Sequence, residues 1–248
     1  MDRATKEFLN YTDKYLKYGE RIKLKISHTF RVVELCKTIA ENLNLTNKEV
    51  ELAGLIGLLH DIGRFEQWKR FKTYKDSDSL DHADLGEEIL KEDNYLRKFI
   101  EDKKYDDIIL KSVKYHNKYK LPNDLEKDEE LFCKIIRDAD KIDILYLYTI
   151  KGIELEIDNE FSEDIFKSLL EMKNISRKKL TNKTDRLAIS LGFIFDMNFI
   201  DSFKYLKEKD YYNTIIDMYK NKSNNKKLKE QLELVREVIN NYIEVRVC

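Results

Sequence analysis

The sequence predicts an all-α protein, and three observations carry that prediction. Only 7 of the 248 residues are Gly and 1 is Pro, far below the usual shares of roughly 7% and 5%, whereas β-rich folds need these residues at their many turns. Hydrophobic residues make up 42% of the chain and aromatic residues 11%, which is enough for a buried core and too much for a disordered chain. Apolar residues also recur at the three- and four-residue spacing of an amphipathic helix.

Five helices are predicted in residues 1–150. The first spans residues 26–43, and the second begins at Thr46, which forms a capping box with Glu49. The third begins after Asp81, whose carboxylate suits the N-cap position. Apolar residues at helical spacing mark the fourth and fifth helices, around residues 109–113 and 131–145.

Residues 151–248 are predicted to form a C-terminal helical extension packed on the first part. No linker rich in Gly, Ser or Pro and no internal repeat divides the chain. An amphipathic helix buries its apolar face equally well against its own chain or another, so a homodimer through this part stays open. Polar stretches predict loops at residues 120–130, 157–163 and 220–227, and apolar periodicity predicts helices over residues 166–172, 186–206, 212–219 and 228–245.

Charge and cysteine content argue against several classes of protein. The chain has 46 Lys and Arg against 47 Asp and Glu, whereas dedicated binders of nucleic acid or anionic membranes usually show a basic excess. The first ten residues lack the apolar segment of a signal peptide, and the longest apolar stretch, residues 52–59, is far shorter than a membrane span. We therefore expect a cytoplasmic protein without a nucleic-acid or membrane partner. The widely spaced Cys36, Cys133 and Cys248 predict neither a disulfide framework nor a thiolate zinc site.

Five polar residues occupy positions that should be apolar. All four histidines fall on the apolar faces of different predicted helices, and an aspartate holds the matching position on the fifth helix. The five residues are His28, His60, His82, His116 and Asp138. A lone inward histidine is most simply a hydrogen-bonded core residue, but an unpaired buried carboxylate is costly and must find a partner. A shared metal centre explains all five together, because imidazole and carboxylate are ligands of Zn, Mn, Fe and Co.

Asp61 directly follows His60. Consecutive residues on a helix point about 100° apart, so both side chains reach one metal only near a helix end. Gly63 predicts that end, as a C-cap.

This ordered set of residues resembles the HD superfamily of metal-dependent phosphohydrolases, which is named for its adjacent His-Asp pair. The resemblance covers roughly residues 20–150 and includes two local strings, LHDIGRF at residues 59–65 and RDADKID at residues 137–143. It implies an HD-domain helical bundle over residues 1–150, with residues 151–248 as the extension. It also implies that a metal-activated water hydrolyses a phosphate ester or anhydride of a nucleotide or similar small molecule.

Position by position, the resemblance implies a centre of two metal ions. The first ion would be bound by His28, His60, Asp61 and Asp138. The second would be bound by His82 and His116, with Asp61 as the bridge between the two ions. Fe, Mn or a mixed pair is expected, while Zn, Co and Ni stay open, because ligand types alone do not choose the metal.

One departure from the family pattern argues against one class of substrate. The branch that degrades cyclic dinucleotides carries two adjacent histidines and a later Gly-Tyr-Pro, whereas here Asn117 follows His116 and the loop reads KLP at residues 120–122. The sequence therefore argues against cyclic dinucleotides. A nucleotide or another small phosphorylated molecule is the expected substrate.

Two cations beside the predicted ligands are candidates for binding phosphate. Lys141 follows Asp138 by three residues, and Arg64 follows Asp61 by three, so each can face the metals from its helix. We expect both to act in catalysis by contacting the substrate phosphate, and Asp61 to act in catalysis as the carboxylate that bridges the metal ions. A salt bridge to a neighbouring carboxylate is the structural alternative.

An aromatic segment follows the His-Asp pair. It contains Phe65, Trp68, Phe71 and Tyr74, interleaved with Lys and Arg. This composition suits a lid that stacks a nucleobase and binds phosphate. Packing of the rings against the core is the alternative use.

Two alternatives to an enzyme stay open. A metal-containing HD module could bind a nucleotide or a protein partner without turnover, although such a descendant need not keep all six ligands. A helical scaffold with incidental core histidines would bind no metal at all. Metal content per chain is therefore the first measurement that separates these hypotheses.

Overall fold

The computed structural model describes residues 1–151 and 159–248, and most of these residues lie in helices joined by loops. No strand occurs in either range, so the all-α prediction is confirmed. The predicted loop over residues 157–163 begins outside the described residues; residues 159–162 are non-helical, and Glu163 already belongs to the next helix. No helix in these ranges combines the length and the apolar character that crossing a membrane requires.

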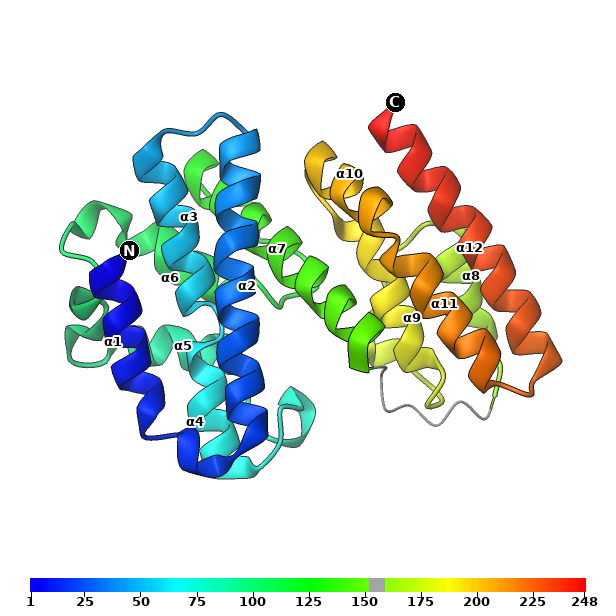
Figure 1. The fold of residues 1–248 in the computed structure, drawn as a ribbon, viewed down its shortest axis with the longest axis horizontal. Coiled ribbons are helices and arrows are strands. Elements are labelled where there is room, and N and C mark those ends of the chain that lie inside the picture. The colour runs from blue at the N-terminus through cyan, green and yellow to red at the C-terminus, as the bar shows by residue number, and fades with distance from the viewer. Residues whose placement is uncertain (152–158) are drawn as a thin grey trace. The chain divides into compact units, whose positions relative to one another are not determined.

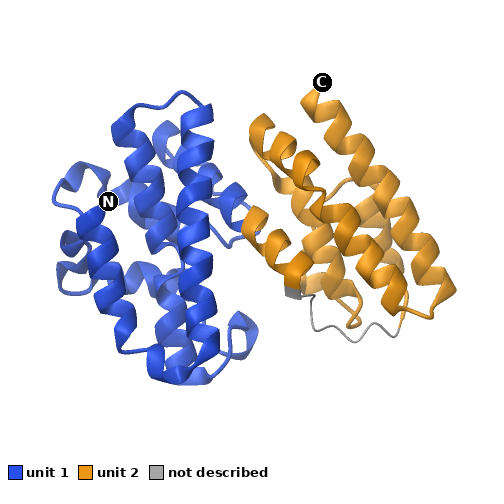
Figure 2. Ribbon diagram, in the orientation of Figure 1, with its two compact units in different colours: residues 1–140 blue, residues 141–248 orange. Residues whose placement is uncertain are grey.

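Two compact units make up the chain, residues 1–140 and residues 141–248 (Figure 2). The division falls inside one helix, α7 (Lys127–Lys151). The domain boundary predicted at residue 150 lies ten residues later, near the end of the same helix.

The first unit consists mainly of helices that pack side by side along the chain order (Figure 1). Helix α2 packs against α3, α4 against α5 and α5 against α6, while α3 also contacts α1 and α6. In addition to the first part of α7, the α-helices of this unit are α1 (Asp2–Asp13), α2 (Glu20–Asn42), α3 (Asn47–Leu59), α4 (Ile62–Phe71), α5 (His82–Lys91) and α6 (Asp106–Tyr115).

In residues 159–248 the second unit contains five further helices, and α12 packs against α8, α10 and α11. The single helix predicted over residues 186–206 is two helices in the structure, separated by a 3-10 segment at Gly192–Asp196. The helices are α8 (Glu163–Leu170), α9 (Asp185–Leu191), α10 (Ile200–Lys209), α11 (Tyr211–Lys222) and α12 (Lys226–Val247).

Local sequence signals explain where the helices of the first unit begin. Thr46 and Glu49 form the predicted capping box at the start of α3, and the Asp81 carboxylate accepts hydrogen bonds from the first backbone N–H groups of α5. Helix α2 begins at Glu20, earlier than residue 26, because Gly19 at φ 92° ends the preceding turn. Helices α1 and α4 were not among the five predicted helices.

Gly63 lies inside α4, so its predicted role as a C-cap is wrong. A Cβ atom built there would lie 2.2 Å from the backbone oxygen of His82 and 2.8 Å from the backbone nitrogen of Gly86. Only a glycine permits the backbones of α4 and α5 to approach so closely. This contact fixes the first turn of α5, which carries His82, against the helix that follows Asp61.

Replacing Gly63 with Ala is therefore expected to destabilise the protein by about 3 kcal/mol, the upper part of the range for overpacking a core. Gly54→Ala is the matched control, because a Cβ there meets only the flexible Lys37 side chain, 2.6 Å from its Cε. Chemical denaturation of both variants measures the effect. Equal stability of the two variants would contradict the prediction.

Candidate metal centre

A break between two helices brings the His-Asp pair into one centre. Helix α3 ends at Leu59 and α4 begins at Ile62, and Asp61 between them has φ −104° and ψ 17°, in the sparsely populated bridge region. The pair consequently lies at a helix end, as the sequence predicted. His60 Nε2 lies 3.5 Å from the Oδ2 atom of Asp61.

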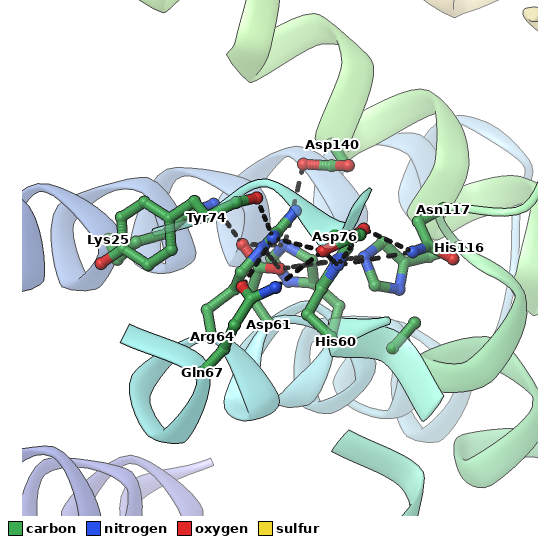
Figure 3. Close-up of polar contacts among 12 residues, drawn as sticks. Lys25, His60, Asp61, Arg64, Gln67, Tyr74, Asp76, His116, Asn117 and Asp140 are labelled. Atoms are coloured by element: carbon green, nitrogen blue, oxygen red, sulfur yellow. Dashed lines mark hydrogen bonds and ion pairs between the residues drawn. The ribbon is translucent and has the colours of Figure 1, made fainter. Parts of the chain in front are cut away.

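Asp61 Oδ2 and the Asp140 carboxylate lie close to the same two histidines, and Figure 3 labels His60, Asp61 and Asp140 of this arrangement. His28 Nε2, from α2, lies 3.5 Å from Asp61 Oδ2 and 3.3 Å from His60 Nε2. Asp140, from α7, places its Oδ1 atom 3.2 Å from His28 Nε2 and 3.7 Å from His60 Nε2. We call His28, His60, Asp140 and Asp61 Oδ2 the first ligand group.

Two further histidines face the other oxygen of the same carboxylate. His82 Nε2, from the start of α5, lies 3.3 Å from Asp61 Oδ1, and His116 Nε2, from the end of α6, lies 3.8 Å from it. The two Nε2 atoms are 3.0 Å apart. We call His82, His116 and Asp61 Oδ1 the second ligand group, so Asp61 belongs to both groups.

The second ring nitrogen of three histidines has its own acceptor. Nδ1 of His60 lies 2.7 Å from the carbonyl oxygen of Gly57, and Nδ1 of His116 lies 2.7 Å from that of Val113. Nδ1 of His82 contacts the Asp76 carboxylate. Carbonyl and carboxylate oxygens only accept, so each Nδ1 is the donor and each Nε2 keeps its lone pair for the centre.

Burial and neighbouring charges set the protonation states. Burial and the adjacent imidazoles lower the pKa of His116 to about 3, which keeps this ring neutral. Burial alone would raise the pKa of Asp61, yet the charge of the Lys25 ammonium holds it well below its usual range. Burial likewise opposes ionisation of Asp140, but its hydrogen bond with His28 lowers the pKa of this carboxyl below its usual value.

This donor set fits a divalent transition metal. A metal requires neutral imidazoles and ionised carboxylates, which are the states derived above for His116, Asp61 and Asp140. Bonds of about 2.0–2.2 Å place neighbouring ligands of one ion roughly 3 Å apart or slightly more, close to the separations within both groups. His28, His60 and Asp140 form one candidate metal cluster. A second cluster, His60, Asp61 and His116, takes residues from both groups, and a third consists of Asp76, Asp81 and His82.

Asp140, rather than the predicted Asp138, brings its carboxylate to His28 and His60. Asp138 is fully buried and Asp140 is 16% exposed, and among the described residues the candidate clusters around these histidines contain Asp140 and not Asp138. The two aspartates lie about 200° apart around α7. A ligand role for Asp138 stays a prediction that the geometry does not favour.

Two cations lie beside Asp61. Lys25, one turn before His28 on α2, forms an ion pair with Asp61 Oδ2 and is 21% exposed. Arg64 places Nε 3.5 Å from Asp61 Oδ1. Its Nη1 donates at 2.8 Å to Asp76 Oδ1 and at 2.6 Å to the carbonyl oxygen of Tyr74. Arg64 therefore fastens the following loop, and its predicted contact with phosphate stays a prediction.

Lys141 is buried in the second unit and forms an ion pair with Asp196. Its ammonium also donates to the backbone oxygen of Asp196 at 3.1 Å. The salt bridge that was the structural alternative for this lysine is therefore present, and its predicted role in catalysis stays untested.

The aromatic segment divides between core and surface. Phe65 is fully buried and Phe71 is 42% exposed. Trp68 and Tyr74 pack on each other with ring centroids 4.8 Å apart, and the Lys25 ammonium lies 5.8 Å from the centroid of Tyr74. The rings of this pair are thus already engaged with one another and with cations.

Three residues of the centre were missed in the sequence. The sequence could have indicated Lys25, because it precedes His28 by three residues on the same helix face. Asp140 follows Ile136 by four residues, but α7 is buried on several sides, so its apolar pattern does not select one inward aspartate. Asp76 lies in a 3-10 turn between helices, where no helical pattern applies.

The fold and the centre together define a helical protein with a cluster of histidines and aspartates that could hold a metal ion. The family model of the HD domain matches residues 26–145, a range that contains both ligand groups. Residues 26–145 therefore form an HD domain, and proteins with this domain are generally metal-dependent hydrolases. No solved structure matches the chain significantly.

Proposed function

We propose that this protein is a metal-dependent phosphohydrolase that uses two metal ions to hydrolyse a phosphate ester or anhydride of a small molecule, with nucleotides as the first substrate class to test. The observation that carries the proposal is the position of Asp61. Its Oδ2 atom faces His28 and His60, and its Oδ1 atom faces His82 and His116. A carboxylate shared in this way suits a bridge between two ions.

The residues of the chain would divide the work of such a reaction. The first ligand group would hold one ion and the second ligand group the other. A bound divalent metal supplies Lewis acidity, which lowers the pKa of a water towards neutrality and withdraws charge from phosphate oxygens. The Nδ1 hydrogen bonds of His60, His82 and His116 keep the three rings in the required orientation and tautomer.

Lys25 is the cation best placed to bind the substrate phosphate. Its ammonium pairs with Asp61, has two further protons to donate and remains partly accessible. An ammonium beside the metal ligands would orient the phosphate and stabilise charge that develops on its oxygens.

Replacing Lys25 with Met is expected to lower kcat/KM by roughly 10- to 100-fold, which corresponds to losing one hydrogen bond to a charged group. Both KM and kcat are expected to change, because the ammonium would contact the phosphate in the substrate and in the transition state, with the metal content per chain unchanged. Lys23→Met is the matched control, because Lys23 is exposed on the same helix and pairs with Glu20. Steady-state kinetics measure the effect, and equal constants for the two variants would exclude Lys25 from substrate binding.

The function itself is tested by metal analysis followed by a substrate screen. Protein purified without chelator should contain close to two transition-metal ions per chain, falling towards one in His82→Ala. Phosphate release from nucleotides and other phosphate esters is then measured with Mn and with Fe. Bound metal without hydrolysis of any compound would favour a binding module without turnover, and absence of metal after reconstitution would refute the enzyme.

A further inference from the structure

The orientation of His82 depends on a loop, unlike that of the other histidines whose Nδ1 partner is described. His60 and His116 each donate to a carbonyl three residues earlier in their own helices. His82 Nδ1 instead lies 2.9 Å and 3.0 Å from the two carboxylate oxygens of Asp76. Asp76 belongs to the 3-10 turn Asp76–Asp78, between α4 and α5.

Asp76 is itself held by two side chains of α4 (Figure 3). Arg64 Nη1 donates to Asp76 Oδ1 at 2.8 Å, and Gln67 Nε2 donates to the same oxygen at 2.9 Å. Gln67 is fully buried. A buried amide that is fully hydrogen-bonded favours one arrangement, because each lost partner would leave a desolvated polar atom.

The same two side chains also fasten the rest of this loop. Arg64 donates to the carbonyl oxygen of Tyr74 at 2.6 Å, and Gln67 Nε2 lies 2.9 Å from both Ser79 Oγ and the carbonyl oxygen of Leu80. Residues 74–80 are thus tied to α4 through the side chains that orient Asp76. A displacement of the loop would also displace the acceptor of His82.

We propose that Asp76 is the positioning residue for the metal ion of the second ligand group, and that occupancy of this group and order in the loop over residues 72–81 stabilise each other. The inference rests on the proposed metal centre and goes beyond it. Asp76 raises the affinity of His82 for metal by fixing the ring with Nε2 towards Asp61. Because coupling between two equilibria is reciprocal, a metal bound at His82 must stabilise the ordered loop by the same factor.

The test compares Asp76→Asn with Asp78→Asn. Asp78 lies in the same turn but is 53% exposed and pairs only with loop neighbours among the described contacts. Binding of Mn²⁺ is measured by equilibrium dialysis. Asp76→Asn should bind the second Mn²⁺ about 10- to 100-fold more weakly, with the first unchanged, whereas Asp78→Asn should match the wild type. A general loss of structure would instead weaken the binding of both ions.

Hydrogen exchange tests the reciprocal effect without relying on the Asp76 variant. Mn²⁺ should slow exchange of residues 72–81 in the wild type and in Asp78→Asn, and should slow it much less in His82→Ala. Equal second-site affinity in the two aspartate variants, or equal protection of the loop in wild type and His82→Ala, would overturn the inference while leaving the phosphohydrolase proposal intact. Wild-type protein that binds no metal would instead overturn both.

Discussion

Replacing Asp61 with Ala should remove both metal ions and reduce hydrolysis by at least about 10²- to 10³-fold, the loss expected when one group that supports transition-state charge is removed. The reason is that Asp61 is the only described side chain with one oxygen facing the first ligand group and the other facing the second. Loss of this carboxylate also leaves Lys25 without its ion-pair partner. The positive charges of Lys25 and Arg64 would then face the histidine rings with no carboxylate to offset them.

Metal analysis of Asp61→Ala beside His82→Ala measures this difference. A shared carboxylate predicts that Asp61→Ala retains fewer ions than His82→Ala, since His82 belongs to one ligand group only. Circular dichroism and thermal unfolding of the same samples establish that both variants are folded. If Asp61→Ala still binds as much metal as His82→Ala, the bridging role is refuted.

The second large effect is expected at Asp140. Asp140→Asn should weaken metal binding by the first ligand group and abolish most hydrolysis, because this carboxylate lies 3.2 Å from His28 Nε2 and 3.7 Å from His60 Nε2. An amide is a poorer ligand for a transition metal than a carboxylate, since it carries no charge to offset that of the ion. We expect a loss of activity on the order of 10²-fold or more.

Asp138→Asn provides the comparison, because Asp138 is the neighbouring aspartate on the same helix; it is fully buried, whereas Asp140 is 16% exposed. The structure predicts that metal per chain falls in Asp140→Asn and is retained in Asp138→Asn. Both variants should be assayed for metal content and for unfolding temperature, so that loss of metal is distinguished from loss of fold. The opposite order would restore the ligand assignment that the resemblance implied.

Features encoded within a few residues were predicted well from the sequence. The capping box of Thr46 and Glu49 and the N-cap of Asp81 depend only on neighbouring backbone groups. The inward positions of the histidines follow from helical periodicity, and all four are buried. The low content of glycine and proline also predicted the all-α fold correctly, because β-rich folds need these residues at their turns.

Features that depend on tertiary packing were not predicted. The role of Gly63 comes from the approach of α5, which the local sequence around α4 does not contain. Asp76 acts on His82 from a loop, where spacing carries no information about direction. On α7 the choice between two aspartates depends on which neighbouring helices cover each face, so periodicity alone could not resolve it.

Two histidines of the candidate metal centre are held in place by the helices that carry them. His60 is the C-cap residue of α3 and His116 is the C-cap residue of α6, and each ring satisfies a carbonyl near the end of its helix. Small zinc domains are unfolded until their metal arrives, but here main-chain hydrogen bonds and core packing orient the rings. The centre is therefore formed by folding and loaded afterwards. A centre of this kind would take its metal according to supply as well as ligand chemistry, so we expect the bound ion to follow the metal that is supplied during growth.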